Sequence, residues 1–101
     1  MRDLVELEQV KAILKELVSI APGHTVEVRI PPYAAVQCVE GPKHTRGTPP
    51  NVVEMSAKTL AALVAGTFAW QDGIENGDIH ASGERSNLES LFKQVTIRMH
   101  P

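Results

Sequence analysis

The chain has 101 residues, of which 43% are hydrophobic and 22% are charged, and its formal net charge is −2. This length fits one domain with a modest core, and the composition is that of a globular rather than a disordered protein. A charge so close to zero gives no strongly basic face, so nucleic-acid binding is not expected. We therefore expect residues 1–101 to form a single domain.

The cysteine content and the apolar runs indicate the compartment. Cys38 is the one cysteine of the sequence, so no disulfide can form within the chain, which suits a reducing environment. Charged residues recur between Asp3 and Glu16, where a signal peptide needs an uninterrupted apolar stretch. The longest apolar run, Leu60 to Ala65, is too short to span a bilayer. The sequence predicts a cytoplasmic protein without stable membrane insertion.

Residues 3–20 are predicted to form an amphipathic helix. Asp3 is a suitable N-cap, and Glu6 can complete a capping box by reaching back to the Asp3 backbone N–H. Apolar residues recur at spacings of three and four, which places them on one stripe of a helix. They are Leu4, Leu7, Val10, Ile13, Leu14, Leu17 and Val18. Pro22 and Gly23 predict the end of the helix.

Five segments alternate with a period of two and are predicted as strands: residues 25–30, 34–39, 51–55, 78–82 and 95–100. In the first of them, Val26, Val28 and Ile30 point to one face. In the last, Val95, Ile97 and Met99 do the same. This alternation is typical of an antiparallel sheet with one buried face and one wet face.

Helices are predicted between and after the third and fourth strands. Ser56 can cap a helix that ends at Ala65, and Gly66 can close it in a left-handed conformation. A short helix then begins at Thr67, passes through Ile74 and ends at Asn76–Gly77. Ser86 and Glu89 form a second capping-box pair before a helix with an apolar face at Leu88, Leu91 and Phe92. Most predicted strands come early in the chain, and most helices lie between or after the later strands. This order predicts an α+β fold: a five-stranded, mainly antiparallel sheet with helices covering one face.

The loop of residues 40–50 is the best candidate for a polar site. Three prolines and two glycines flank Lys43, His44 and Arg46. These cationic side chains can hold a phosphate or carboxylate head group, or contact a partner protein. The glycine spacing differs from that of a phosphate-binding P-loop, so a stiff, solvated crossover between two strands is the competing interpretation.

Catalytic and metal-binding patterns are not found in the sequence. His24, His44, His80 and His100 lack the spacing that presents two imidazoles to one metal, so no metal site is predicted. Cys38 lies on the apolar side of a predicted strand, where a thiol acts as a small core residue. No G-x-S-x-G motif occurs. We expect a non-catalytic protein without a cofactor.

An apolar cluster on the predicted helices is the candidate ligand site. Three of the four aromatic residues fall within it, and helices that cover a sheet through few contacts can separate to admit a lipid chain. Core packing is the competing interpretation for the same side chains. The cluster comprises Leu60, Leu63, Val64, Phe68, Trp70, Ile74, Leu88, Leu91 and Phe92.

The segment from Asn51 to Phe92 resembles the sterol carrier protein family. In that family, a helix ending in glycine precedes a short helix, a glycine-flanked strand and a leucine-rich helix. Gly66, Gly77, Ile79, Gly83 and Glu84 take the corresponding places here, with Glu84 where the family usually has aspartate. Residues 21–54 are similar to the short stand-alone sterol carrier family proteins of actinobacteria, so the resemblance covers nearly the whole chain.

The resemblance implies an apolar tunnel for sterols, fatty acids or acyl-CoA, and no catalytic residues. The leading hypothesis is therefore a carrier domain for a lipid or acyl chain. The alternative is an accessory domain that docks on a separate enzyme without a small ligand. This docking would use the loop or an exposed sheet face formed by Glu27, Arg29, Gln37, Glu54, His80 and Arg98. An independent enzyme is the third and least favoured hypothesis.

Overall fold

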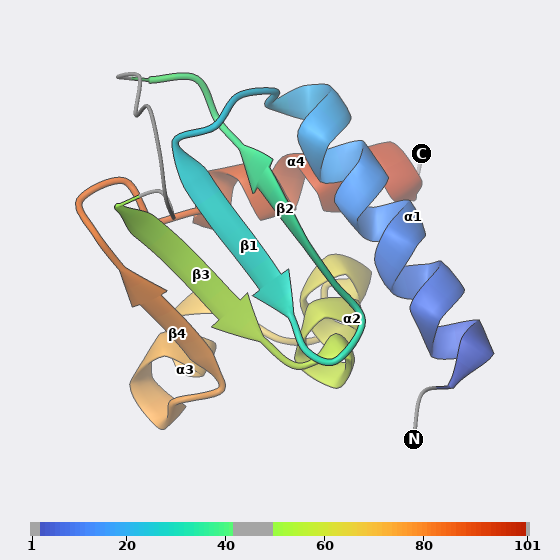
Figure 1. Ribbon diagram of the computed structural model, residues 1–101. Coiled ribbons are helices and arrows are strands. Elements are labelled where there is room, and N and C mark those ends of the chain that lie inside the picture. Colours follow the sequence, from blue (N-terminus) through green and yellow to red (C-terminus); the bar gives the residue numbers. More distant parts are fainter. Residues whose placement is uncertain (1–2, 42–49, 101) are drawn as a thin grey trace.

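The computed structural model describes residues 3–41 and 50–100. Within these ranges the chain forms four helices and four strands (Figure 1). In chain order they are α1 (Leu4–Ile20), β1 (Val26–Ile30), β2 (Ala34–Cys38), β3 (Asn51–Met55), α2 (Ala57–Ala65), α3 (Trp70–Asn76), β4 (Ile79–Ser82) and α4 (Glu89–Met99). The predicted α+β class is confirmed. The predicted five-stranded, mainly antiparallel sheet is wrong, because the described residues form a four-stranded sheet whose central pair is parallel.

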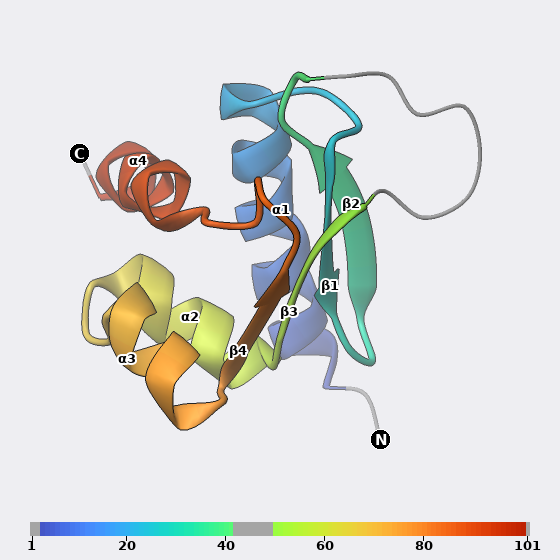
Figure 2. The ribbon, with the colours of Figure 1, turned by 90° about the vertical axis from the view of Figure 1, so that its left-hand side faces the viewer.

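The strands form one mixed sheet in the order β2-β1-β3-β4. The outer pairs, β1 with β2 and β3 with β4, are antiparallel, whereas the central pair of β1 and β3 is parallel. Cys38 at the end of β2 and Asn51 at the start of β3 both pair with Val26. The strand β3 lies on the side of β1 opposite β2. Because its first residue is level with the first residue of β1, β3 runs parallel to β1. The helices cover one face of this sheet, as predicted (Figure 2).

The predicted fifth strand, residues 95–100, is wrong, because these residues belong to the second half of α4 and the turn after it. Val95 and Met99 are four residues apart, so they fit one helix face as well as one strand face. The deciding residue is Ile97, which a strand would bury beside them. It is 71% exposed, while Leu91, Phe92 and Val95 form the buried stripe of a helix.

The start of α1 is capped as predicted, but the capping box closes through a third residue. Asp3 Oδ1 accepts hydrogen bonds from the backbone N–H groups of Val5 and Glu6, at 2.8 and 3.1 Å. The Asp3 N–H donates to the Tyr33 hydroxyl at 3.3 Å, and this hydroxyl donates to the Glu6 carboxylate. The hydrogen bond to Glu6 raises the pKa of Tyr33. The cap therefore also fastens α1 to the turn between β1 and β2.

The other helix boundaries follow local capping chemistry. Ser56 Oγ accepts from the Thr59 N–H at 3.1 Å, and Gly66 closes α2 at φ +81°, both as predicted. The α3 helix begins at Trp70, later than Thr67. The Ser86–Glu89 capping box is wrong, because the N-cap of α4 is Leu88, while Ser86 Oγ donates to the Gly83 carbonyl at 2.7 Å. No helix in the described part of the chain is long and apolar enough to cross a membrane.

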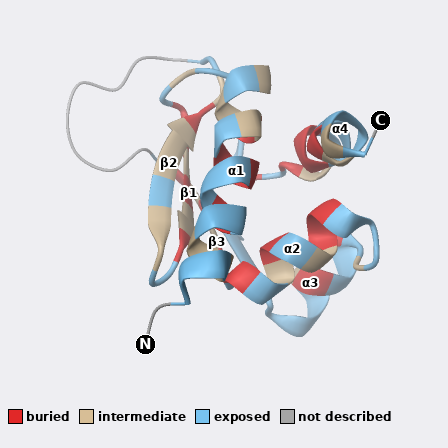
Figure 3. Ribbon diagram, turned by 90° about the vertical axis from the view of Figure 1, so that its right-hand side faces the viewer, coloured by how far each residue is buried: buried red, intermediate tan, exposed pale blue. Residues whose placement is uncertain are grey.

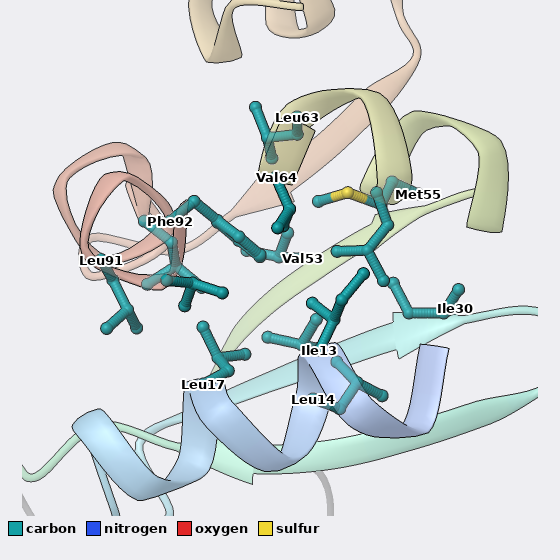
Figure 4. Close-up of a cluster of buried hydrophobic side chains, with 14 of the residues drawn as sticks. Ile13, Leu14, Leu17, Ile30, Val53, Met55, Leu63, Val64, Leu91 and Phe92 are labelled. Carbon is teal, nitrogen blue, oxygen red and sulfur yellow. The ribbon is translucent and has the colours of Figure 1, made fainter. Parts of the chain in front are cut away.

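The core lies between the covered face of the sheet and the helices α1, α2 and α4 (Figures 3 and 4). Alternate residues of β1 and β3 face it, as the predicted period of two requires. Leu14 and Leu17 from α1 lie opposite Val53 and Phe92 in the close-up (Figure 4). Helices from both ends of the chain, α1 and α4, therefore share this core.

Cys38 is fully buried on the core side of β2, as predicted. Burial raises the pKa of its thiol from 9.0 to about 11. Between these pH values the thiol ionises in the unfolded chain before it ionises in the folded one. The free energy of unfolding should then fall by about 1.4 kcal/mol per pH unit. Urea denaturation across this pH range measures the slope. The variant Cys38→Ala should show a shallower decline, and equal slopes would contradict the assignment to this thiol.

Candidate functional site

A groove of about 690 Å³ separates α2 and α3 on one side from α4 on the other. Figure 3 shows these helices on the part of the molecule farthest from β2. We call it the helical groove. It is lined by Leu63, Gly66, Thr67, Phe68, Ala69, Trp70, Asp72, Glu89, Phe92, Lys93, Thr96 and Ile97.

Two stacked aromatic rings form the floor of the helical groove. The ring centroids of Trp70 and Phe92 are 6.0 Å apart, with an angle of 26° between the ring planes. Only 4% of Trp70 and 2% of Phe92 is exposed, so both rings also belong to the core. Offset stacking of this kind stabilises the pair beyond the apolar area that it buries. The stacked pair is therefore shared between the lining of the helical groove and the core.

Two glycines shape the walls of the helical groove, one at a turn and one inside a helix. Gly66 ends α2 in the left-handed conformation, and the Thr67 hydroxyl then donates to the Ala62 carbonyl at 3.2 Å. This turn leads directly to Phe68, which is half-buried in the wall. Gly73 in α3 leaves room for its neighbours, because a Cβ there would lie 2.4 Å from the Ile79 side chain and 3.0 Å from the Phe68 ring.

The opposite wall and the rim come from α4. Ile97 is 71% exposed and gives the groove an apolar lip. Asp72, Glu89 and Lys93 place charged groups in the lining. The arrangement combines an apolar floor with a few polar groups, which is the usual character of a small-molecule site.

The structure separates the nine apolar residues predicted as the ligand site. Leu63, Phe68, Trp70 and Phe92 line the helical groove. Ile74 lines a different groove of about 470 Å³ beside β3 and β4. The others are buried in the core: Leu60, Val64, Leu88 and Leu91. Sequence reasoning missed Thr96 and Ile97, because residues 95–100 were predicted as a strand. It missed Lys93 because this residue lies outside the predicted apolar face of the last helix.

The predicted polar residues of the 40–50 loop, Lys43, His44 and Arg46, lie outside the described residues. Within the described ranges, no group of three or more His, Cys, Asp or Glu residues could hold a metal ion. The cation that lines the helical groove there is Lys93.

The predicted polar sheet face is largely present. The register pairs Glu27 with Gln37, Arg29 with Glu54, and Glu54 with His80, so these side chains share the face away from the helices. Arg29 Nε lies 2.6 Å from Glu27 Oε2 in an ion pair on this face. The prediction that Arg98 is the sixth member of this sheet face is wrong. It belongs to α4, where its Nε lies 3.7 Å from Glu16 Oε2 of α1.

Comparison with known proteins identifies the family. A comparison with curated proteins gives no match. The family model described as "Bacterial SCP ortholog", where SCP denotes sterol carrier protein, matches residues 3–93. The match spans every described element except the end of α4. The chain therefore belongs to the sterol carrier protein-like family of bacteria.

Proposed function

We propose that the chain is a non-catalytic carrier that binds a single-chain lipid, such as a fatty acid or an acyl-CoA, along the helical groove. The observation that carries this proposal is the groove itself, with its floor of Trp70 and Phe92. Its volume of about 690 Å³ lies within the usual range of small-molecule sites. Membership of a family of carriers supports the same role.

An alkyl chain in the helical groove covers apolar surface that is now in contact with water. Ile97 and Phe68 stand on opposite walls, so a chain between them contacts both. Each buried methylene contributes about 0.8 kcal/mol, so a chain of medium length is sufficient for binding. At the rim, Lys93 can pair with an anionic head group, while Asp72 and Glu89 can accept hydrogen bonds from a hydroxyl head group.

Fluorescence of Trp70 tests the proposal directly, because this is the one tryptophan of the sequence and it forms the groove floor. The purified protein is titrated with dodecanoate and with dodecanol, and native mass spectrometry records any lipid that co-purifies. We expect a saturable fluorescence change with at least one of the two probes. Replacing Ile97 by aspartate should weaken that binding about tenfold to a hundredfold, the loss expected for one buried isoleucine.

Val5→Asp is the matched control. Val5 is 68% exposed on α1, close to the 71% of Ile97, and lies outside the helical groove. This variant should bind both probes as the parent does. If neither probe changes the Trp70 signal up to millimolar concentration and no lipid co-purifies, the carrier proposal fails. The alternative of protein docking on the face of Glu27, Arg29 and Glu54 then becomes the favoured one.

A further inference from the structure

The strand β2 is an edge of the sheet and has no strand on its outer side in the described residues. Its five residues, Ala34–Cys38, include no charged side chain and no proline. Native proteins usually protect an edge strand with such residues, because unpaired backbone N–H and C=O groups invite another strand. The β2 edge lacks this protection.

An apolar groove of about 480 Å³ runs between this edge and α1. Figure 3 shows β2 and α1 side by side on the part of the molecule away from α3. We call it the edge groove. Its lining combines apolar residues of both elements with charged residues of α1. These residues are Glu8, Lys11, Ala12, Leu14, Lys15, Val18, Ala34 and Val36.

Both ends of the edge groove are fixed by hydrogen bonds. At one end, the Tyr33 hydroxyl joins the turn before β2 to Asp3 and Glu6 of α1. At the other end, the Val39 N–H donates to the Ala21 carbonyl at 2.7 Å. The separation of α1 from β2 is therefore set by the fold before any partner binds, which lowers the entropic cost of binding.

The rim of the edge groove is positively charged. Lys11 and Lys15 are both exposed on α1, one turn apart. Lys11 Nζ lies 3.8 Å from Glu8 Oε1, so the single carboxylate of the lining already has a partner. No ion pair is formed by Lys15 among the described residues. This charge is complementary to an acidic ligand.

We propose that the edge groove binds an extended segment of a partner protein whose side chains toward α1 are alternately apolar and acidic. The segment adds to β2 as a further strand, and its backbone supplies the hydrogen bonds that β2 lacks on this side. Its apolar side chains contact Leu14, Val18 and Val36, and its carboxylates contact Lys11 and Lys15. This surface is separate from the helical groove.

A synthetic peptide of two Val-Thr-Glu-Thr repeats, capped at both ends, is the probe, because its valines and glutamates lie on one face of an added strand. Fluorescence anisotropy measures its binding, and hydrogen exchange measures the protection of the Ala34–Cys38 amides. We expect binding that protects these amides. The variant Lys15→Glu should weaken binding about fivefold to tenfold, because it replaces an attraction by a repulsion at an exposed site. Val36→Lys, which places a charge in the groove, should abolish binding.

Lys58→Glu is the matched control for charge, since Lys58 is an exposed lysine of α2 outside the edge groove, and it should bind the peptide as the parent does. A peptide of two Val-Thr-Lys-Thr repeats should not bind to the parent. The proposal is overturned if the acidic peptide fails to bind at millimolar concentration, or if Val36→Lys leaves its affinity unchanged. It is also overturned if sedimentation shows a dimer of the parent that Val36→Lys dissociates, because a second copy then occupies the edge.

Discussion

Replacing Phe92 by alanine is expected to lower the free energy of unfolding by about 3 to 5 kcal/mol. Phe92 is 2% exposed and is among the largest fully buried side chains of the described residues. Its ring stacks on Trp70 and lies between α4 and the side chains of the sheet and α2 (Figure 4). The substitution removes this contact and leaves a cavity where three elements meet. Urea denaturation followed by far-ultraviolet circular dichroism measures the loss.

Phe68→Ala is the control for Phe92→Ala, because it also replaces a phenylalanine by alanine. Phe68 lies in the wall of the helical groove and is only half-buried. We expect a smaller loss of about 1 to 2 kcal/mol, since much of this ring is already in contact with water. Similar losses in the two variants would show that the Trp70–Phe92 stack is not part of the cooperative core. The floor of the proposed site would then be mobile.

Much of the fold follows from local patterns that only one structure satisfies. In α1, the stripe of apolar residues specifies both a helix and the face of it that is buried. In β1 and β3, the alternation of apolar and polar residues specifies both a strand and its buried face. Ser56 and Gly66 fix the ends of α2 because a cap and a left-handed residue have few substitutes. These predictions are confirmed because each depends on residues that are close in sequence.

The remaining features depend on contacts between distant residues. The strand β3 pairs with β1 in parallel because Asn51 is placed beside Val26 of β1 and not beside β2. No local pattern determines that placement. For α4, the four-residue spacing of Val95 and Met99 is compatible with both a helix and a strand. Only packing against α1 and α2 decides between the two, and it leaves Ile97 exposed.

The candidate site was predictable only in part for the same reason. Aromatic residues in the region of α2, α3 and α4 indicated an apolar surface, and four of the predicted residues do line the helical groove. Sequence could not distinguish these from Leu60 or Val64, which lie on the same helix as Leu63 but point into the core. Exposure depends on how α4 lies across α2, so Lys93 and Ile97 could be assigned only from the structure.

Replacing Gly23 by alanine is expected to lower the free energy of unfolding by about 3 to 5 kcal/mol, as the sum of backbone strain and overpacking. Gly23 has φ +146°, and a Cβ there would lie 2.1 Å from the Val39 carbonyl oxygen and 2.6 Å from the Glu40 nitrogen. These neighbours are backbone atoms, so rotation of a side chain cannot relieve the clash. The Val39 N–H donates to the Ala21 carbonyl, and the Val39 carbonyl accepts from the Thr25 N–H at 3.1 Å. Moving Val39 therefore disturbs the junction of α1, β1 and β2.

Gly66→Ala separates the two causes of that loss. Gly66 also has a positive φ, at +81°, but a Cβ there would meet nothing within 4 Å. Only strain remains, so we expect a loss of about 1 kcal/mol. Urea denaturation compares the variants, and hydrogen exchange at the Val39 amide should accelerate in Gly23→Ala alone. Equal losses would mean that the chain relaxes freely around Gly23. The close approach of Gly23 to Val39 would then not hold α1 against β2.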